Sequence, residues 1–434
     1  MFAYNLEMAL RSLKRNRALT LLMVLAIALG IGASMTTLTV LHVLSGDPIP
    51  GSSAQLYYPQ MDPRDMDGYT PTSKPPDQLS YPDGMALLKA ARGTHQALMT
   101  GGAVPIQPPQ SGIEPFIEDA RYTTADFFPM FNVPFIFGHP WASTEDEAKA
   151  RVVVITRELN DKIFSGKDST GQSLRVNGHD LRVIGVIDNW RPNPHFYDLN
   201  MSTYSEKENV FVPLFTARDL LLGRNGSSDC WGNKSNDGEH METSECVWLQ
   251  FWVQLDSPAK AAAYKEFLIH YSQDQKALGR FQRPPNVALS NVMEWLDINK
   301  VVPGDVRLQV WLALGFLVVC LVNTVGLMLA KFLRRASELG VRRALGASRR
   351  VIFAQLLVEA GLVGLVGGVA GLLLSLVGLW LVRLQPSDYA SLAHLDLPML
   401  LATFVLAVSA TLVAGMLPAW RACQVVPALQ LKSN

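Results

Sequence analysis

The 434-residue sequence lacks the short motifs that carry the commonest kinds of catalysis and nucleotide binding. It contains no G-x-x-x-x-G-K-[ST] phosphate loop, no H-E-x-x-H zinc motif, no G-x-S-x-G nucleophile elbow and no C-x-x-C pair. Without a phosphate loop the chain has no recognisable site for ATP, so an ATP-driven complex needs another chain to bind the nucleotide. Histidines scattered among predicted loops and strand ends, without metal-like spacing, are His95, His139, His179, His195 and His240. We therefore expect no catalytic residue, no metal and no cofactor in this chain.

Charge is scarce: 18% of the residues are charged and 49% are hydrophobic, a balance that leans toward a membrane protein. Crossing a hydrocarbon core takes about 20 residues of helix. Windows of that length without Asp, Glu, Lys or Arg are 18–44, 308–330, 360–382 and 397–420. The first is longer than the roughly 7–15 apolar residues of a secretory signal, so we expect it to remain as an uncleaved span.

The formal net charge of zero conceals two regions of opposite sign. The segments 1–17, 331–350 and 421–434 together hold 13 basic and 2 acidic residues. Apart from Glu359, the rest of the chain holds 25 basic and 35 acidic residues. Short basic segments next to spans stay in the cytoplasm. This distribution therefore predicts that both termini and the 331–350 loop are cytoplasmic and that the region after the first span is outside.

The predicted fold is an α-helical membrane protein with four transmembrane helices and a large α/β domain inserted between the first and second helices. The predicted segments are a cytoplasmic N-terminal segment (1–17), a first span (18–45), the exported α/β domain (46–306), a second span (307–330), a cytoplasmic loop (331–350), a third span (351–382), a short exported loop (383–396), a fourth span (397–420) and a cytoplasmic tail (421–434).

Cysteine placement agrees with this topology. Cys230 and Cys246 lie in the exported region, whereas Cys320 lies in a predicted span and Cys423 on the cytoplasmic side. In an oxidising compartment a bond that closes a loop of about 15 residues contributes up to about 3 kcal/mol. We expect a Cys230–Cys246 disulfide; the alternative is two free thiols.

The exported region carries local signals of mixed α/β structure. Residues 81–91 and 258–271 have helical character, and Thr156 is placed to cap a helix that ends near residue 164. Further strands are expected at 151–155, 210–215 and 247–255. Between the alternating runs 174–176 and 181–187, Asn177-Gly178 predicts a tight hairpin turn, because Asn and Gly tolerate positive φ angles.

Two stretches of the exported region give no regular pattern. Residues 223–245 form a polar loop rich in Gly, Asn, Ser and Asp, and residues 48–76 are rich in proline and are expected to be irregular and extended. We expect two subdomains with the change near residues 216–246. The segment 189–196 (NWRPNPHF) looks like a binding loop, but we interpret it as a surface loop with ordinary packing.

The predicted spans contain small residues at the spacing of close helix contacts. In the third span Gly364 pairs with Gly368 and Gly367 with Gly371, and the first span places Ala26, Gly30 and Ser34 four residues apart. Glycine is common in membrane helices, so one pair would carry little weight. Two overlapping pairs predict a close helix contact, either within the chain or between subunits.

One carboxylate lies close to the apolar part of the third span. Glu359 is by default a functional candidate, because charge inside a membrane is costly. It is also only nine residues past Arg350. A structural role, reaching the headgroups or pairing with arginines of the loop, is the interpretation that we prefer.

The cytoplasmic loop, in which residues 334–350 read RRASELGVRRALGASRR, is the most informative segment. The arginines alone would be a positive anchor. In addition, residues 338–345 can form a short helix in which Leu339 and Leu345 offer apolar contacts, Gly346 ends the helix and Ser348 caps the next span. A rigid helix between two spans suits a device by which a soluble motor moves both spans.

At this loop the sequence closely resembles the FtsX-like, MacB-type family of ABC permeases, through residues 338–347 (ELGVRRALGA). Residues 355–371 (QLLVEAGLVGLVGGVAG) look like the third helix of that family, and 415–422 (GMLPAWRA) with 427–429 look like its C-terminal end. The N-terminal residues 9–16, and the exported strands 152–155 and 185–186, fit the macrolide-exporter type of domain. The resemblance thus spans nearly the whole chain.

The resemblance implies four membrane helices with a periplasmic domain, working as a dimer with two ATPase subunits in a bacterial inner membrane. It implies that the loop helix docks on the ATPase and that ATP-driven closure moves the periplasmic domains by mechanotransmission. By position, the ATPase-coupling residues would be Glu338, Leu339, Gly340, Arg342, Arg343, Leu345 and Gly346. In contrast to the fused arrangement of the macrolide exporter, we expect the ATPase on a separate chain, and the 434 residues contain one permease unit.

The implied partners are ABC-type ATPase subunits that bind ATP-Mg, a second permease (identical or related), a periplasmic adaptor and membrane lipid, with no nucleic acid. The leading functional hypothesis is export of a peptide, antibiotic or amphiphile from the periplasm or membrane. The alternative is a lever that regulates a periplasmic partner and transports nothing. A membrane-anchored enzyme is disfavoured by the missing catalytic motifs.

Overall fold

A computed structural model describes residues 2–109, 112–201, 203–204, 208–232, 241–243, 245–385, 395 and 397–424. The chain forms two compact units: residues 46–301 make an extramembrane unit, while residues 1–45 and 302–434 together make a membrane unit. The two crossings between the units lie at the end of the first long helix and just before the second.

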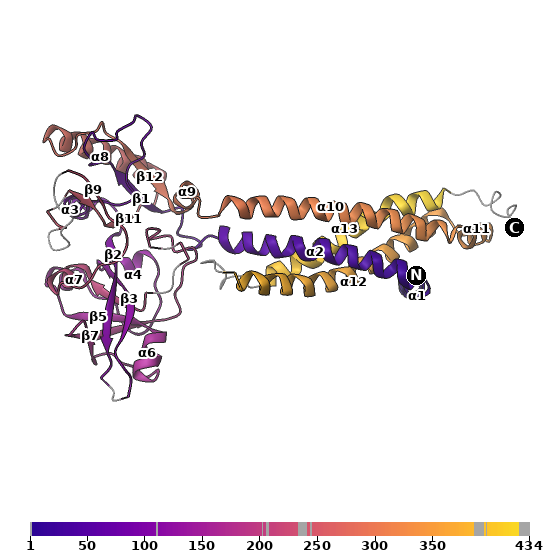
Figure 1. Ribbon diagram of the computed structural model, residues 1–434, viewed down its shortest axis with the longest axis horizontal. Coiled ribbons are helices and arrows are strands. Elements are labelled where there is room, and N and C mark those ends of the chain that lie inside the picture. Colours follow the sequence, from indigo (N-terminus) through magenta and orange to yellow (C-terminus); the bar gives the residue numbers. More distant parts are fainter. Residues whose placement is uncertain are drawn as a thin grey trace. The chain divides into compact units, whose positions relative to one another are not determined.

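The membrane unit consists of long apolar helices joined to shorter ones (Figure 1). Its helices are α1 (Phe2–Arg15), α2 (Arg17–Ser45), α10 (Gly304–Leu333), α11 (Ala336–Ala344), α12 (Arg349–Arg383) and α13 (Leu397–Cys423). Within the described residues, four of them, α2, α10, α12 and α13, are long and apolar enough to cross a membrane. The large α/β unit follows the first of these and precedes the second, as predicted. Most of the short exported loop (386–394 and 396) and of the tail (425–434) lies outside the described residues.

Glycines allow α12 to approach two helices on two different sides. A Cβ on Gly364 would collide with Thr411 of α13, and one on Gly368 would lie 2.8 Å from Ala407 of the same helix. Gly367 and Gly371 face α2 instead, where added Cβ atoms would lie 2.7 Å from the Ile27 side chain and 2.9 Å from that of Ile31. Each of the two overlapping glycine pairs therefore serves a different helix of the same chain.

The small residues of α2 lie against α10. A Cβ on Gly30 would come within 2.9 Å of Leu317, and the hydroxyl of Ser34 donates a hydrogen bond of 3.1 Å to the carbonyl oxygen of Ala313. Buried side chains from all four long helices then form one apolar core. Large apolar residues that remain exposed on these helices, such as Leu25, Trp311 and Val405, suit contact with lipid.

The extramembrane unit is built on one mixed sheet, in the order β12-β1-β11-β2-β3-β8-β5-β7-β4, with β6 paired to both β2 and β7 (Figure 1). The strands of this sheet are β1 (Leu56–Met61), β2 (Gln96–Gln107), β3 (Phe116–Thr123), β4 (Phe135–Gly138), β5 (Val152–Thr156), β6 (Ser173–Val176), β7 (His179–Ile187), β8 (Val210–Pro213), β11 (Gln250–Gln254) and β12 (Val287–Asn291). The helices of the unit are α3 (Tyr81–Ala90), α4 (Phe127–Met130), α5 (Ser143–Glu147), α6 (Arg157–Phe164), α7 (Leu214–Asp219), α8 (Pro258–Ala277) and α9 (Val292–Ile298).

Local sequence signals located several of these elements correctly. Thr156 caps α6, because its hydroxyl accepts a hydrogen bond from the backbone N–H of Leu159 at 3.3 Å. Asn177 and Gly178 have φ angles of 48° and 79° and join β6 to β7, which confirms the predicted hairpin. The helix expected at 258–271 begins as predicted and continues to residue 277.

Other expectations were wrong where tertiary pairing outweighed local pattern. The proline-rich stretch 48–76 contains β1, which pairs with β11 on one side and β12 on the other. The strand expected at 210–215 ends at Pro213, and α7 begins at Leu214. The strand expected at 247–255 divides into β11 and the two-residue β10 (Cys246–Val247), which belongs to a separate small sheet. Strands from before and after residues 216–246 share the large sheet, so this segment does not divide it.

The disulfide lies at the short strand pair β9 (Asp229–Cys230) and β10. Cys230 and Cys246 are opposite each other in the register and are bonded. Cys320 and Cys423 are free and buried. Part of the polar loop 223–245, namely residues 233–240 and 244, lies outside the described residues.

The segment 189–196, interpreted above as a surface loop, is partly buried. Phe196 and Tyr197 pack in an aromatic cluster with Phe131 and Trp252. The Tyr197 hydroxyl donates a 2.6 Å hydrogen bond to Glu208. The segment is partly buried because its aromatic residues fill the space beside the sheet. Its polar residues and prolines had suggested a surface loop.

A buried ion pair lies beneath that segment. The Arg121 guanidinium contacts Asp198 at 2.7 Å and pairs with Glu208, and all three side chains are almost completely buried. Burial raises the pKa of Glu208, but Arg121 and His195 outweigh this effect and hold the pKa well below its usual range. Glu208 therefore remains ionised, and it contacts both Arg121 of β3 and His195 of the segment.

Candidate coupling site around the loop helix

The loop helix, α11, is closed by the residues that the sequence pointed to. It spans Ala336–Ala344, close to the predicted 338–345, and Gly346 follows it with a φ angle of +99°. The Ser348 hydroxyl then accepts a hydrogen bond from the backbone N–H of Val351 and caps α12. Only residues 345–348 separate the loop helix from the third span.

A buried ion cluster, defined as Ser12, Lys331, Arg335 and Glu359, lies beside the loop helix. The Glu359 carboxylate of α12 pairs with the Lys331 ammonium at 2.7 Å and with the Arg335 guanidinium at 3.0 Å. The Ser12 hydroxyl of α1 donates a 2.5 Å hydrogen bond to the same carboxylate, and Arg335 donates a 2.8 Å hydrogen bond to Ser12. Each of the four residues is at most 6% exposed. One carboxylate therefore joins α1, the end of α10 and α12.

Because Glu359 contacts Ser12, Lys331 and Arg335 at once, a shift of one helix relative to the others would break at least one of these contacts. Removing one partner of a buried ion pair leaves an uncompensated charge and costs about 3–5 kcal/mol. Displacing the helices by a few ångströms would expose Glu359 to the same penalty, because its side chain is buried. Of the two roles considered for Glu359, the structure shows pairing with an arginine of the loop, Arg335, and adds Lys331.

A second, more exposed set of contacts surrounds Glu338 of the loop helix. Its carboxylate pairs with Arg15 of α1 at 2.9 Å and with Arg342 at 3.0 Å, and it also contacts Arg335. Partial burial raises the pKa of Glu338, but hydrogen bonds from Arg335 and Arg15 outweigh that effect, so the pKa lies below its ordinary value. Glu338 is therefore ionised at neutral pH and connects the buried ion cluster to the loop helix.

The arginine pair of the loop helix holds the helix to the spans. Arg342 donates a hydrogen bond to the Gln355 side chain of α12 at 3.3 Å, and Arg343 donates one to the Cys423 carbonyl oxygen at the end of α13, also at 3.3 Å. Leu339 is buried in the core of the membrane unit. The loop helix is thus fixed to α1, α12 and α13 by side chains that point inward.

One face of the loop helix remains uncovered in the described chain. Ser337, Val341, Ala344 and Leu345 are exposed and follow the i, i+4, i+7, i+8 spacing of a single helical face. Val341 is 47% exposed and Leu345 is 83% exposed. Of the two leucines expected to offer apolar contacts, Leu339 is therefore buried in the core and Leu345 is left exposed. The uncovered face is small and, apart from Ser337, apolar.

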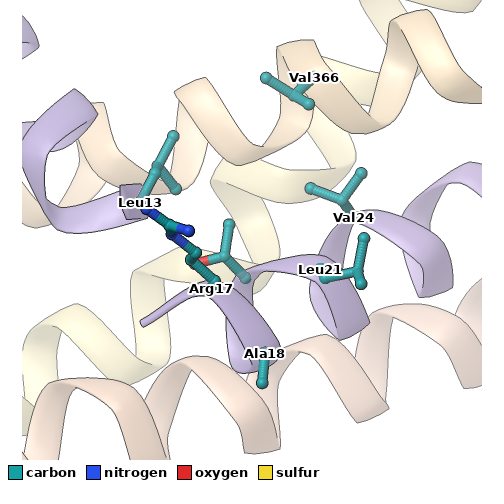
Figure 2. A pocket seen from close by; sticks show the side chains of 7 residues that line it. Leu13, Arg17, Ala18, Leu21, Val24 and Val366 are labelled. Atoms are coloured by element: carbon teal, nitrogen blue, oxygen red, sulfur yellow. The ribbon is translucent and has the colours of Figure 1, made fainter. Parts of the chain in front are cut away.

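An apolar recess of about 480 Å³ opens at the start of α2 (Figure 2). Figure 2 shows it bounded by α1, α2 and α12, with Arg17 directed toward Leu13. The hydroxyl of Thr20, which also lines the recess, accepts a hydrogen bond of 3.4 Å from Lys331. With a largely apolar lining and an open mouth, the recess suits acyl chains of lipid better than a polar substrate.

Sequence reasoning missed half of this site. Ser12, Arg15 and Lys331 were not singled out, and Arg335 was seen only as part of a basic run. The available signal was the spacing: Lys331 and Arg335 are four residues apart where the second span ends, and the acidic residue Glu359 follows in the next span. Among the described residues no group of three or more His, Cys, Asp or Glu side chains is arranged to hold a metal ion. His240 lies outside them.

Two domain families cover most of the chain. Residues 20–269 match the MacB-like periplasmic core domain, and residues 310–427 match the FtsX-like permease C-terminal domain. The macrolide export ATP-binding/permease protein MacB of Shigella boydii serotype 4 is 25% identical over 97% of this chain and 59% of its own length. MacB of Bdellovibrio bacteriovorus is 24% identical over 61% of this chain and 35% of its own length.

Other relatives carry related names. The pyoverdine export ATP-binding/permease protein PvdT of Pseudomonas entomophila is 25% identical over 71% of this chain and 42% of its own length. The periplasmic region of MacB from Actinobacillus actinomycetemcomitans superposes with a TM-score of 0.37 at 12% identity, covering 59% of this chain and 96% of that structure. This chain spans between 35% and 59% of the length of these MacB and PvdT proteins.

The first domain match alone covers more than half of the sequence, and the second contains the loop helix and the buried ion cluster apart from Ser12. The order of the two matches agrees with the order of the units: four apolar helices, with the large mixed α/β domain between the first and the second. The chain belongs to the family of MacB-like ABC transporter permeases, with a MacB-like periplasmic core domain and an FtsX-like permease domain.

Proposed function

We propose that this chain is the permease subunit of an ATP-driven export complex that works by mechanotransmission. In this proposal the termini and the loop helix are cytoplasmic, in a bacterial inner membrane, and residues 46–301 are periplasmic. A separate ABC-type ATPase binds ATP-Mg and presses on the loop helix, and a second permease, identical or related, completes the complex. The spans pass the movement to the periplasmic unit, which expels a peptide, an antibiotic or another amphiphile.

The observation that carries the proposal is the uncovered face of the loop helix. Val341, Ala344 and Leu345 are exposed although the rest of the helix is firmly held to the spans. A firmly held helix with an apolar face suits a partner protein that delivers force, because a loosely held helix would yield instead of moving the spans.

The names of the relatives support export over regulation. MacB is named for export of macrolides and PvdT for export of pyoverdine, and both names combine ATP-binding and permease functions. The regulatory lever, our alternative, would use the same loop helix. A change in sensitivity to amphiphilic antibiotics when the gene is deleted would favour export.

Charge on the exposed face tests the docking step. The tagged full chain is purified from its own host, and the amount of ATPase that accompanies it is measured. We expect Leu345→Glu to lower this amount about tenfold or more, as for other central apolar anchors. The measurement is quantitative mass spectrometry of the purified complex together with its ATP hydrolysis. Leu278→Glu, at an equally exposed leucine of the extramembrane unit, is the matched control.

Equal ATPase recovery from the Leu345→Glu variant and the wild type, at equal membrane insertion, would refute docking on this face. Failure of any ATPase to accompany the wild-type chain would refute the larger proposal.

A further inference from the structure

The helix α1 and the α10–α11 junction meet α12 at the single carboxylate of Glu359. Oε1 contacts the Lys331 ammonium at 2.7 Å and the Ser12 hydroxyl at 2.5 Å, while Oε2 contacts the Arg335 guanidinium at 3.0 Å. Every contact is close enough to be a charge-assisted hydrogen bond, and such bonds depend strongly on geometry. Glu359 thus determines where α1 and the α10–α11 junction lie on α12.

The N-terminal helix α1 is bound twice. Glu359 of α12 holds Ser12, and Glu338 of the loop helix holds Arg15, with a distance of 2.9 Å between the charged atoms. Ser12 and Arg15 are three residues apart and lie on neighbouring positions of one helix face. The same Arg335 contacts both acids. α1 is therefore tied to the loop helix and to the third span through one connected set of charges.

An apolar contact would allow these helices to slide, because dispersion forces change gradually with displacement. A buried ion pair does not allow sliding, since separated charges in a dry environment lose their partners altogether. Replacing a whole buried ion pair by apolar or neutral side chains of similar size is, in contrast, often tolerated by the fold. Position and stability can consequently be tested separately at this site.

We propose that Glu359 is a positioning residue that makes α1, the loop helix and α12 move as one body, so that the N-terminal helix belongs to the coupling device. The proposal rests on the proposed function in one respect, namely that a partner displaces the loop helix. It extends coupling from the loop helix to Glu359 and α1.

The decisive variant is the double substitution Lys331→Met with Glu359→Gln in the full chain. It removes one positive and one negative charge together, and Arg335 keeps Glu338 as a partner, so the helices still fold and insert. We expect α1 to exchange its amide hydrogens faster than in the wild type, as measured by hydrogen–deuterium exchange of the purified protein in lipid nanodiscs. We also expect the chain's stimulation of the bound ATPase to fall about tenfold, within the usual range of coupling between sites, with ATPase binding unchanged.

The matched control removes one positive and one negative charge from α1 itself. Glu7 and Arg11 form an exposed ion pair, and Glu7→Gln with Arg11→Gln leaves the buried ion cluster intact. This control should exchange and couple like the wild type. Glu359→Asp, which keeps the charge but shortens the side chain, should stimulate the bound ATPase more than the double variant does and less than the wild type does.

Wild-type exchange of α1 in the double variant would overturn the proposal, and so would faster exchange with full ATPase stimulation. Loss of ATPase binding would overturn it as well, because the cluster would then act on docking and not on transmission. The proposed function fails in a different way: Leu345→Glu would leave ATPase binding unchanged, or the wild type would bind no ATPase. In either case the exchange measurement still decides whether Glu359 holds α1.

Discussion

At the scale of single residues, burial of Asp146 in α5 makes the stability of the folded unit depend on pH. Its Oδ2 accepts a 2.6 Å hydrogen bond from the backbone N–H of Ala125, and the side chain is otherwise surrounded by protein. Burial raises the pKa of Asp146 to about 7, although this hydrogen bond acts in the opposite direction. The unfolded chain has an Asp pKa of about 3.9. Between these values the folded protein holds a proton that the unfolded chain has released.

This difference predicts that the extramembrane unit loses stability as pH rises. The contribution of Asp146 is complete below about pH 4 and is lost as pH rises through about 7, amounting to at most about 4 kcal/mol. In Asp146→Asn this contribution no longer depends on pH. The difference in Tm between wild type and Asp146→Asn, measured from pH 4 to 8, should therefore change steadily and level off above about pH 7.

The exposed Asp161→Asn variant serves as the control and should follow the wild type at every pH. A Tm difference between wild type and Asp146→Asn that stays constant from pH 4 to 8 would contradict the raised pKa.

At the scale of elements, replacing glycine by alanine in the long helices should raise or lower stability according to what surrounds each glycine. Alanine favours helix over glycine by about 1 kcal/mol where nothing obstructs its Cβ. At Gly364 the new Cβ collides with Thr411, and at Gly367 it lies 2.7 Å from Ile27, so close packing opposes the gain. We expect Gly364→Ala and Gly367→Ala each to lower stability by about 1–3 kcal/mol. Gly326→Ala in α10, where no atom lies within 4 Å of the new Cβ, should be neutral or stabilising.

The measurement is thermal unfolding of the detergent-solubilised chain, with Gly326→Ala as the internal reference. If all three alanine variants shifted Tm in the same direction, α12 would not be packed against α2 and α13 through these glycines.

At the scale of the whole molecule, the division into two units predicts that residues 46–301 fold without the membrane helices. The strands of the large sheet and the apolar core of the unit all come from within this range. The excised fragment should be soluble, show α/β circular dichroism and melt in one transition. The Cys230–Cys246 bond, whose cysteines are 16 residues apart, should contribute about 3 kcal/mol, so that reduction lowers its Tm.

A fragment with Cys230→Ser and Cys246→Ser is the matched control, since reductant should leave its Tm unchanged. Aggregation of the oxidised fragment, or a broad transition without cooperativity, would show that the unit depends on the membrane helices.

Much of the architecture was readable from the sequence because it depends on local composition. A charge-free run of membrane-spanning length excludes most alternatives to a span, and the four long helices of the structure contain the four predicted windows. The Asn177-Gly178 turn was predictable because Asn and Gly tolerate positive φ angles. The Thr156 cap was predictable because its hydroxyl accepts a hydrogen bond from a backbone N–H group in the first turn of the helix. The glycine pairs of α12 indicated a close helix contact, but their two separate partners did not follow from spacing.

Other features depended on residues that meet only in three dimensions. β1 lies in a proline-rich stretch and exists because β11 and β12 pair with it on both sides. The burial of Tyr197 follows from the aromatic side chains that surround it. Glu359 drew attention as an isolated acid in a span, yet Ser12, 347 positions away, cannot be assigned to it from spacing.

The sequence alone determined that the chain spans a membrane, carries a large α/β domain after its first span and has a short helix between two later spans, because length, charge and capping are local properties. Only the tertiary structure decided which side chains of that helix face inward and which remain exposed. It also brought α1 onto Glu359, because the cost of a buried charge is met by whichever partners the fold brings within about 3 Å.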